Sequence, residues 1–174
     1  MARSATYSPY RRDADRRPEA KARDPLPDAN RIREIVVDGN VAALVEEADK
    51  IGKMIADEDL KTNQIRNVFG TARQIQLRWK TSSDHQSSDR QSSDDQSYRE
   101  AVLLIPKLGY YAKRESQAKN NRSEGMKILK DVLEPGLRLL MEDGISEDEK
   151  HKRFERLMDF FEAIVAYHKC YGGK

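Results

Sequence analysis

Apolar residues recur along most of this chain at the three- and four-residue spacing of an amphipathic α-helix. One run follows the turn at Asp38 and Gly39, where Asn40 is placed to act as an N-cap. Its apolar positions are Val41, Leu44, Val45, Ala48, Ile51 and Ile55. A second run follows Thr62, a residue type that caps helices. Its apolar positions are Ile65, Val68, Phe69, Ala72, Ile75 and Trp79.

A third helix is predicted to begin at Ser97, because Ser97 and Glu100 have the spacing of a capping box. One face of this helix is apolar and carries Tyr98, Ala101, Ile105, Leu108 and Ala112. Proline lacks the N–H that a helix interior requires, so Pro106 should kink or split the helix.

Two further helices follow. One runs from about residue 123 to residue 140, contains Pro135 and can end at Gly144. The last opens with a second capping box, formed by Ser146 and Glu149. Its apolar side carries Phe154, Leu157, Met158, Phe161, Ile164, Val165 and His168.

The fold class follows from this periodicity. No segment alternates with the two-residue period of a strand, except the brief run at residues 35–37. We therefore predict an all-α bundle of about five helices in a single domain, residues 30–174. A short extra helix is expected near Arg31–Val36.

Two segments are too polar to form a core. Residues 1–29 contain four prolines, seven basic and five acidic residues, and are predicted to be a disordered tail. Its charge excess of 7 − 5 = +2 equals that of the whole chain, 32 − 30 = +2. Residues 82–97 include three successive copies of a pentapeptide, SSDHQ, SSDRQ and SSDDQ. We predict a flexible loop there.

Composition excludes several classes of protein. Charged residues make up 36% of the chain, well above the usual share of about 25%, which is typical of a small, heavily solvated domain. No apolar run approaches the roughly 20 residues of a membrane span. Cys170 is the single cysteine and no signal peptide is evident, so the cytoplasm is the expected location.

Motifs for catalysis are missing from the sequence. The histidines are His85, His151 and His168, and none forms an HExxH pair. We interpret His168 as a packing residue on an apolar stripe. No phosphate-binding glycine loop or nucleophile elbow is present. We therefore predict no enzyme activity, catalytic residue, metal site, cofactor or small-molecule substrate.

Basic residues spaced seven apart suggest contacts with a nucleic acid. Successive members of such a row lie only about 20° apart around a helix. The candidates are Arg66, Arg73 and Lys80 in the second helix and Lys107 and Arg114 in the third. Tyr110 and Tyr111 lie between the last two and can stack on bases. From spacing alone, a solvated helix surface is the better explanation of these cations, because lysine and arginine at such spacings are common on helical bundles.

Three strings resemble one known family. Residues 61–70 read KTNQIRNVFG, residues 103–114 read LLIPKLGYYAKR, and residues 160–173 read FFEAIVAYHKCYGG. In this order they resemble the small subunit of the type III-A CRISPR effector, the Csm complex. The resemblance covers most of residues 32–173.

The resemblance implies a non-catalytic helical subunit that acts in antiviral defence. Several copies would stack as the minor filament and help to hold target RNA paired with guide RNA. Its other partners would be the backbone, large and capping subunits. The resemblance places Arg66, Lys107 and Arg114 near RNA, whereas Arg73 and Lys80 are added from helical geometry. The SSDxQ repeat, inserted directly after Lys80, departs from the family pattern.

Two alternatives remain open on the sequence. One is the small subunit of a different type III complex, and the other is a helical scaffold that binds only proteins. Salt separates RNA binding from protein binding, because phosphate contacts weaken steeply as salt rises.

Overall fold

The computed structural model describes residues 25–83, 90–117 and 124–173. Within them the chain forms α-helices and one short 3₁₀ turn, and no strand, which confirms the all-α fold class. The elements are α1 (Ala29–Val36), α2 (Val41–Asp57), α3 (Thr62–Ser83), α4 (Arg90–Val102), α5 (Leu104–Gln117), α6 (Gly125–Arg138), η1 (Leu139–Met141) and α7 (Glu147–Cys170). None of these helices is long and apolar enough to cross a membrane.

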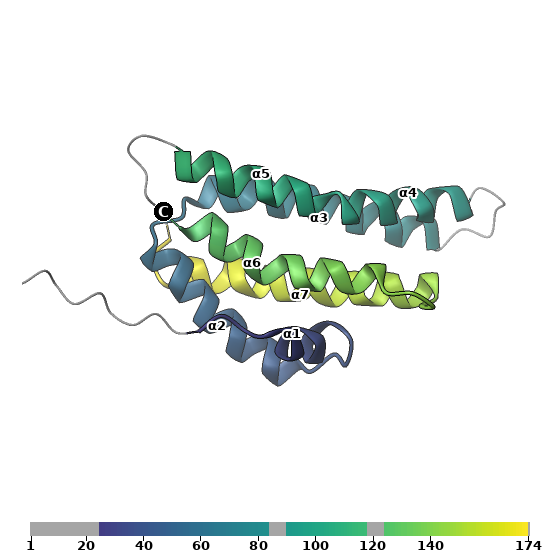
Figure 1. Ribbon diagram of the computed structural model, residues 1–174, viewed down its shortest axis with the longest axis horizontal. Helices are drawn as coiled ribbons and strands as arrows, with labels where there is room; N and C mark the ends of the chain where they lie inside the picture. Colours follow the sequence, from purple (N-terminus) through teal and green to yellow (C-terminus); the bar gives the residue numbers. More distant parts are fainter. Residues whose placement is uncertain (1–24, 84–89, 118–123, 174) are drawn as a thin grey trace, which may run out of the picture.

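The helices form an elongated bundle around α7 (Figure 1). α7 packs against α2 and α3, while α6 packs against α5 and α2. α4 and α5 follow one another along one edge of the molecule, and α1 and α2 lie at the opposite edge. The two edges are therefore separated by the α6–α7 layer.

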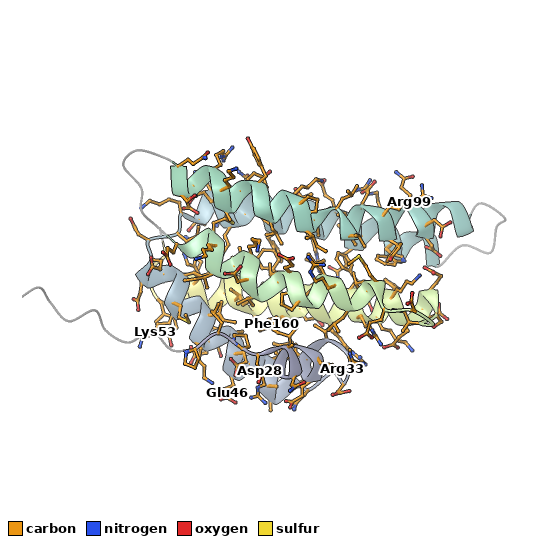
Figure 2. The ribbon with its side chains drawn as sticks, viewed as in Figure 1. Asp28, Arg33, Glu46, Lys53, Arg99 and Phe160 are labelled. Carbon is orange, nitrogen blue, oxygen red and sulfur yellow. The ribbon has the colours of Figure 1, made fainter. Side chains whose placement is uncertain are left out.

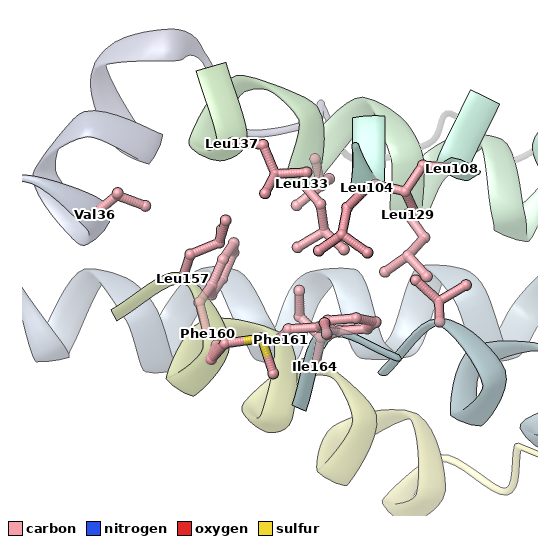
Figure 3. Packing of buried hydrophobic residues seen from close by; sticks show 14 of the residues in the cluster. Val36, Leu104, Leu108, Leu129, Leu133, Leu137, Leu157, Phe160, Phe161 and Ile164 are labelled. Atoms are coloured by element: carbon pink, nitrogen blue, oxygen red, sulfur yellow. The ribbon is translucent and has the colours of Figure 1, made fainter. Parts of the chain in front are cut away.

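The core joins leucines of α5 and α6 to aromatic residues of α7 (Figure 3). Phe160 and Phe161 are both buried although they are consecutive in sequence. The ring of Phe161 meets that of Phe69 in α3, with centroids 5.3 Å apart and nearly perpendicular planes. Almost all predicted apolar positions are buried or partly buried, so the helical pattern identified the core correctly.

Val41 and Val45 are exceptions. Both were expected on the buried face of α2, but they are 69% and 45% exposed. The buried side of α2 is instead a neighbouring line that includes Ala43 and Gly52, and Gly52 lies against α7. A Cβ atom on Gly52 would lie 2.4 Å from the Cβ of Tyr167. Because the two backbones approach each other so closely, the side of α2 with small residues faces α7. The side with Val41 and Val45 remains exposed.

The predicted short N-terminal helix is present as α1. Of the three residues in the brief strand-like run, Ile35 and Val36 belong to α1 and Val37 is its C-cap. Residues 25–29 are the part of the predicted disordered tail that the structure describes. Asp28 accepts a hydrogen bond from the Arg31 amide and caps α1, while Leu26 packs against the core. The prediction of disorder is wrong for this short stretch because it has a cap and a partly buried side chain.

Two predicted helix caps are confirmed. Asn40 Oδ1 accepts from the Ala43 amide at 3.1 Å. Ser146 Oγ accepts from the Glu149 amide at 3.2 Å. These side chains satisfy amides that the first turn of a helix leaves without partners.

Thr62 does not cap α3. Lys61 occupies the cap position, and its amide donates to Oε1 of Gln64 at 3.0 Å. The Thr62 hydroxyl donates instead to the carbonyl of Gly173 at 3.3 Å. A tertiary contact with the end of α7 has thus replaced the local one.

Residues 84–89 of the predicted loop over residues 82–97 lie outside the described part, and the remaining residues of that range are helical. α3 continues through Ser83, and α4 begins at Arg90, within the repeat. Ser97 is consequently a buried interior residue of α4, so the predicted capping box is wrong. Glu100 pairs with Arg78 of α3 at 2.5 Å, and packing between the two helices explains why α4 starts earlier.

Pro106 divides the predicted third helix, as expected. α4 ends at Val102 and α5 begins at Leu104. A helix that continued through this region would need an amide at residue 106 for the Val102 carbonyl, and proline has none. Pro135, by contrast, lies inside α6, which ends at Arg138 and is followed by η1. Gly144 follows η1 in a left-handed conformation, with φ of +79°.

The close contact between α2 and α7 predicts opposite effects for two glycine substitutions. Gly52→Ala should lower the free energy of unfolding by about 1–3 kcal/mol, since the helices must move apart. Gly70→Ala in α3 meets no atom within 4 Å and should raise it by about 0.5–1 kcal/mol. Chemical denaturation measures both. Equal effects of the two substitutions would contradict the close-packing explanation.

His168 predicts a pH dependence of stability. It is fully buried, which lowers its pKa below the ordinary value of 6.5. The unfolded chain therefore binds a proton more readily than the folded one as pH falls below 6.5, and the free energy of unfolding should fall with it. Denaturation between about pH 8 and pH 5 measures the slope. His168→Gln should flatten it, whereas an unchanged slope would rule His168 out as its source.

Candidate nucleic-acid interface

Cations without ion pairs gather on α3, α4 and α5. From Thr62 to Trp79, α3 contains three arginines and no acidic residue. Arg78 pairs with Glu100, whereas exposed Arg66 forms no ion pair with any described residue. Exposed Arg99 and Lys113 are likewise outside the ion pairs that the structure describes, and Figure 2 shows Arg99 on the outer side of α4. These last two residues do not belong to the rows of basic residues spaced seven apart.

Elsewhere most cations are neutralised by carboxylates. Arg31 of α1 contacts three glutamates, Glu34, Glu46 and Glu47, at 2.6–3.3 Å. Hydrogen bonding from Lys50, followed by its charge, lowers the pKa of Glu46. In the remaining described helices, Lys53, Lys127 and Lys152 are exposed and lack ion pairs to described residues. Arg156 and Lys169 of α7 also lack carboxylate partners there, and they donate to backbone carbonyls instead. The α1–α2 edge therefore carries an internally compensated charge network.

One strip of α5 combines exposed cations and apolar groups. Leu103 directly precedes the helix, and Lys107, Tyr110 and Arg114 continue at the spacing of a single helical face. Leu103 is 53% exposed and Tyr110 is 61% exposed. The acidic residue of this helix, Glu115, is buried on another side. The exposed residues of the strip are therefore basic or apolar, and none of them is a carboxylate.

Two tyrosines orient Arg114. Its guanidinium carbon lies 5.9 Å from the ring centroid of Tyr110 and 5.5 Å from that of Tyr111. The two rings meet edge to face, with centroids 5.7 Å apart. Cation–π attraction limits the positions of the guanidinium and leaves its N–H groups available for phosphate oxygens. The exposed Tyr110 ring can also stack on a base.

Arg73 has a different environment. It donates to Oε1 of Gln76 at 2.7 Å and lies near Asp159 of α7. Burial raises the pKa of Asp159, with smaller contributions from Glu155 and Glu162, and Arg73 acts in the opposite direction. The spacing of these three carboxylates is visible in the sequence, but their proximity to Arg73 is a tertiary feature. An RNA phosphate at Arg73 would also meet this acidic row.

The five predicted cations thus lie on two helices, with Arg66, Arg73 and Lys80 on α3 and Lys107 and Arg114 on α5. Lys80 lies within α3, but its side chain is outside the described part. The described residues also contain no group of three or more histidine, cysteine, aspartate or glutamate residues arranged to hold a metal ion.

Comparison with known families gives a match over residues 38–174 to the model described as Csm2 Type III-A. Searches among curated proteins and among solved structures give no match. The family match includes the strings of α3, α5 and α7 and nearly all of the helical bundle. The chain therefore belongs to the Csm2 family and is a small subunit of the type III-A CRISPR effector, the Csm complex.

Proposed function

We propose that this Csm2 protein is a non-catalytic RNA-binding subunit that stacks in several copies as the minor filament of the complex. In this role it helps to hold target RNA paired with the guide RNA. Its partners are the two RNAs, other copies of itself and the backbone, large and capping subunits, in the cytoplasm. The observation that carries the proposal is the α5 strip, where Lys107 and Arg114 are exposed and form no ion pair with a described residue.

The spacing of the strip suits a phosphate backbone. Seven residues of helix span about 10.5 Å, so Lys107 and Arg114 can contact phosphates of one bound strand. Each contact is weak because exposed charges are screened by salt. Stacked copies would align equivalent strips along one RNA, and linked weak contacts would then give a useful overall affinity.

The five candidates should not contribute equally. Lys107, Arg114 and Arg66 are exposed without ion pairs to described residues, so their charges are available for phosphate contacts. Arg73 should contribute less, because Asp159 and its acidic neighbours lie nearby. Lys80 continues the α3 row by its spacing and remains a candidate on that ground alone.

A protein-binding scaffold is the second candidate function. It is favoured by the exposed valines of α2, Val41 and Val45, which lie on a different helix from the α5 strip. The two functions are compatible within one complex. The type III-A family match removes the other alternative, a small subunit of a different type III complex.

Charge reversal tests the RNA contact. Lys107→Glu with Arg114→Glu should weaken binding to oligouridine and oligocytidine by similar factors, because phosphate contacts carry no base information. The slope of log affinity against log salt should shrink by about 0.7 for each lost contact on single-stranded RNA. Fluorescence anisotropy at several salt concentrations measures both quantities, for the free protein and for the assembled complex.

The matched control is Lys53→Glu with Lys127→Glu. These two lysines are also exposed and lack ion pairs to described residues, but they lie on α2 and α6. The control variant should retain most of the affinity, and circular dichroism should show unchanged helicity in both. Equal losses in the two variants would mean that net charge, rather than the α5 strip, accounts for binding.

The proposal also predicts that the purified protein neither cleaves RNA nor hydrolyses nucleotides, with or without divalent metal. Labelled RNA and nucleotide turnover can be followed across the fractions of a final size-exclusion column. Activity that coelutes with the protein in constant ratio would contradict the non-catalytic role.

A further inference from the structure

The link between α2 and α3 is held by a buried histidine of α7. The link begins with Asp59, whose φ of +57° is in the left-handed region, and continues through the fully buried Leu60. The Leu60 amide donates to the Ile55 carbonyl at 3.1 Å and closes the end of α2. The Leu60 carbonyl lies 2.9 Å from Nε2 of His168. A carbonyl only accepts, so Nε2 carries the proton and donates to it.

The C-terminal turn closes over the other side of this contact. Gly172 has φ of +81°, and the Gly173 amide donates to the His168 carbonyl at 2.9 Å. A Cβ atom on Gly173 would lie only 2.1 Å from Cε1 of the His168 ring, so only glycine fits there. The Gly173 carbonyl in turn accepts from the Thr62 hydroxyl at 3.3 Å. The ring is thus enclosed between the link and the turn, and both contact the first residues of α3.

Arg66 lies one helical turn after Thr62. It is exposed and has no ion pair with a described residue, so nothing described at its guanidinium fixes its position. Its location depends on where α3 begins and in which direction the helix leaves the link. Arg114 differs, because it is on α5 and is oriented by its own tyrosines.

We propose that His168 is a positioning residue for RNA binding: its hydrogen bond to the Leu60 carbonyl sets the start of α3 and thereby places Arg66 against the RNA. This inference rests on the proposed RNA contact of Arg66. It assigns a role in binding to a residue that is itself buried and touches no ligand.

The test is a double-mutant cycle on oligouridine affinity in the full chain. His168→Phe keeps an aromatic ring but removes the donor, whereas His168→Gln retains an N–H that can reach the Leu60 carbonyl. His168→Phe should weaken binding about threefold or more, a size typical of coupled residues. It should have the same effect when combined with Arg114→Glu and no further effect when combined with Arg66→Glu. His168→Gln should restore most of the affinity.

If His168 only stabilised the fold, the double-mutant cycle would give a different result. Loss of folded protein would weaken binding by the same factor in the Arg66→Glu and Arg114→Glu backgrounds, and this outcome would overturn the inference. Thr62→Val provides a milder variant if His168→Phe is poorly folded, and it should show the same dependence on Arg66. If Arg66→Glu alone leaves the affinity unchanged, the proposed RNA contact of Arg66 fails, and the positioning role fails with it. If Arg66→Glu still weakens binding and His168→Phe weakens it further by its full factor, the RNA contact of Arg66 stands. Only the positioning role of His168 is then refuted.

Discussion

The burial of one broad face of α7, which packs against both α2 and α3, is the constraint on which this fold depends. Its consecutive phenylalanines are both buried, and Phe161 contacts Phe69 of α3. On the side of α2, the backbones approach so closely at Gly52 that a β-carbon would collide with Tyr167. A helix enclosed in this way determines the relative positions of its neighbours, since a packed interior leaves little free volume for adjustment. Helices α2 and α3, which are joined by a short connection, are therefore both held in place by α7.

Electrostatics divides the molecule along the same layers. At the α1–α2 edge, Arg31, Arg33 and Lys50 are engaged by glutamates, although Lys53 is not. One of these glutamates is Glu142, which follows η1, and hydrogen bonding from Arg33 and then Arg153 lowers its pKa. At the α4–α5 edge, cations such as Lys107 and Arg114 have no such partners among the described residues. A nearly neutral chain can therefore present a local positive surface, which an overall net charge of +2 does not reveal. Membership in the Csm2 family gives this surface a biological setting in an RNA-guided complex.

The histidine and the glycine pair of the C-terminal string, residues 160–173, both have structural roles. Histidine supplies a donor to a buried carbonyl, and the glycine pair allows the chain to turn back across the imidazole ring. The Nδ1 atom of His168 is buried without a hydrogen-bond partner in the described part of the chain, which is consistent with a neutral ring. The end of the last helix is in this way joined to the start of α3, so that the termini of elements distant in sequence form one unit.

The sequence by itself determined the elements whose signals are local. Helical spacing identified the core residues, Asn40 and Ser146 were correctly assigned as caps, and Pro106 marked the division between α4 and α5. These features depend on backbone geometry within a few residues. The candidate cations were also visible from their spacing, and the strings of α3, α5 and α7 indicated the family.

Only the tertiary structure decided features that depend on a distant partner. Val41 and Val45 have the spacing of a core stripe, yet α7 approaches α2 along its small residues and leaves both valines exposed. Thr62 has the chemistry of a cap, but the Gly173 carbonyl takes its hydroxyl. Arg73 belongs to a basic row by its periodicity, whereas the fold brings Asp159 beside it and weakens its attraction for phosphate. In each case a local preference of modest energy gave way to packing or charge contributed by a helix far away in sequence.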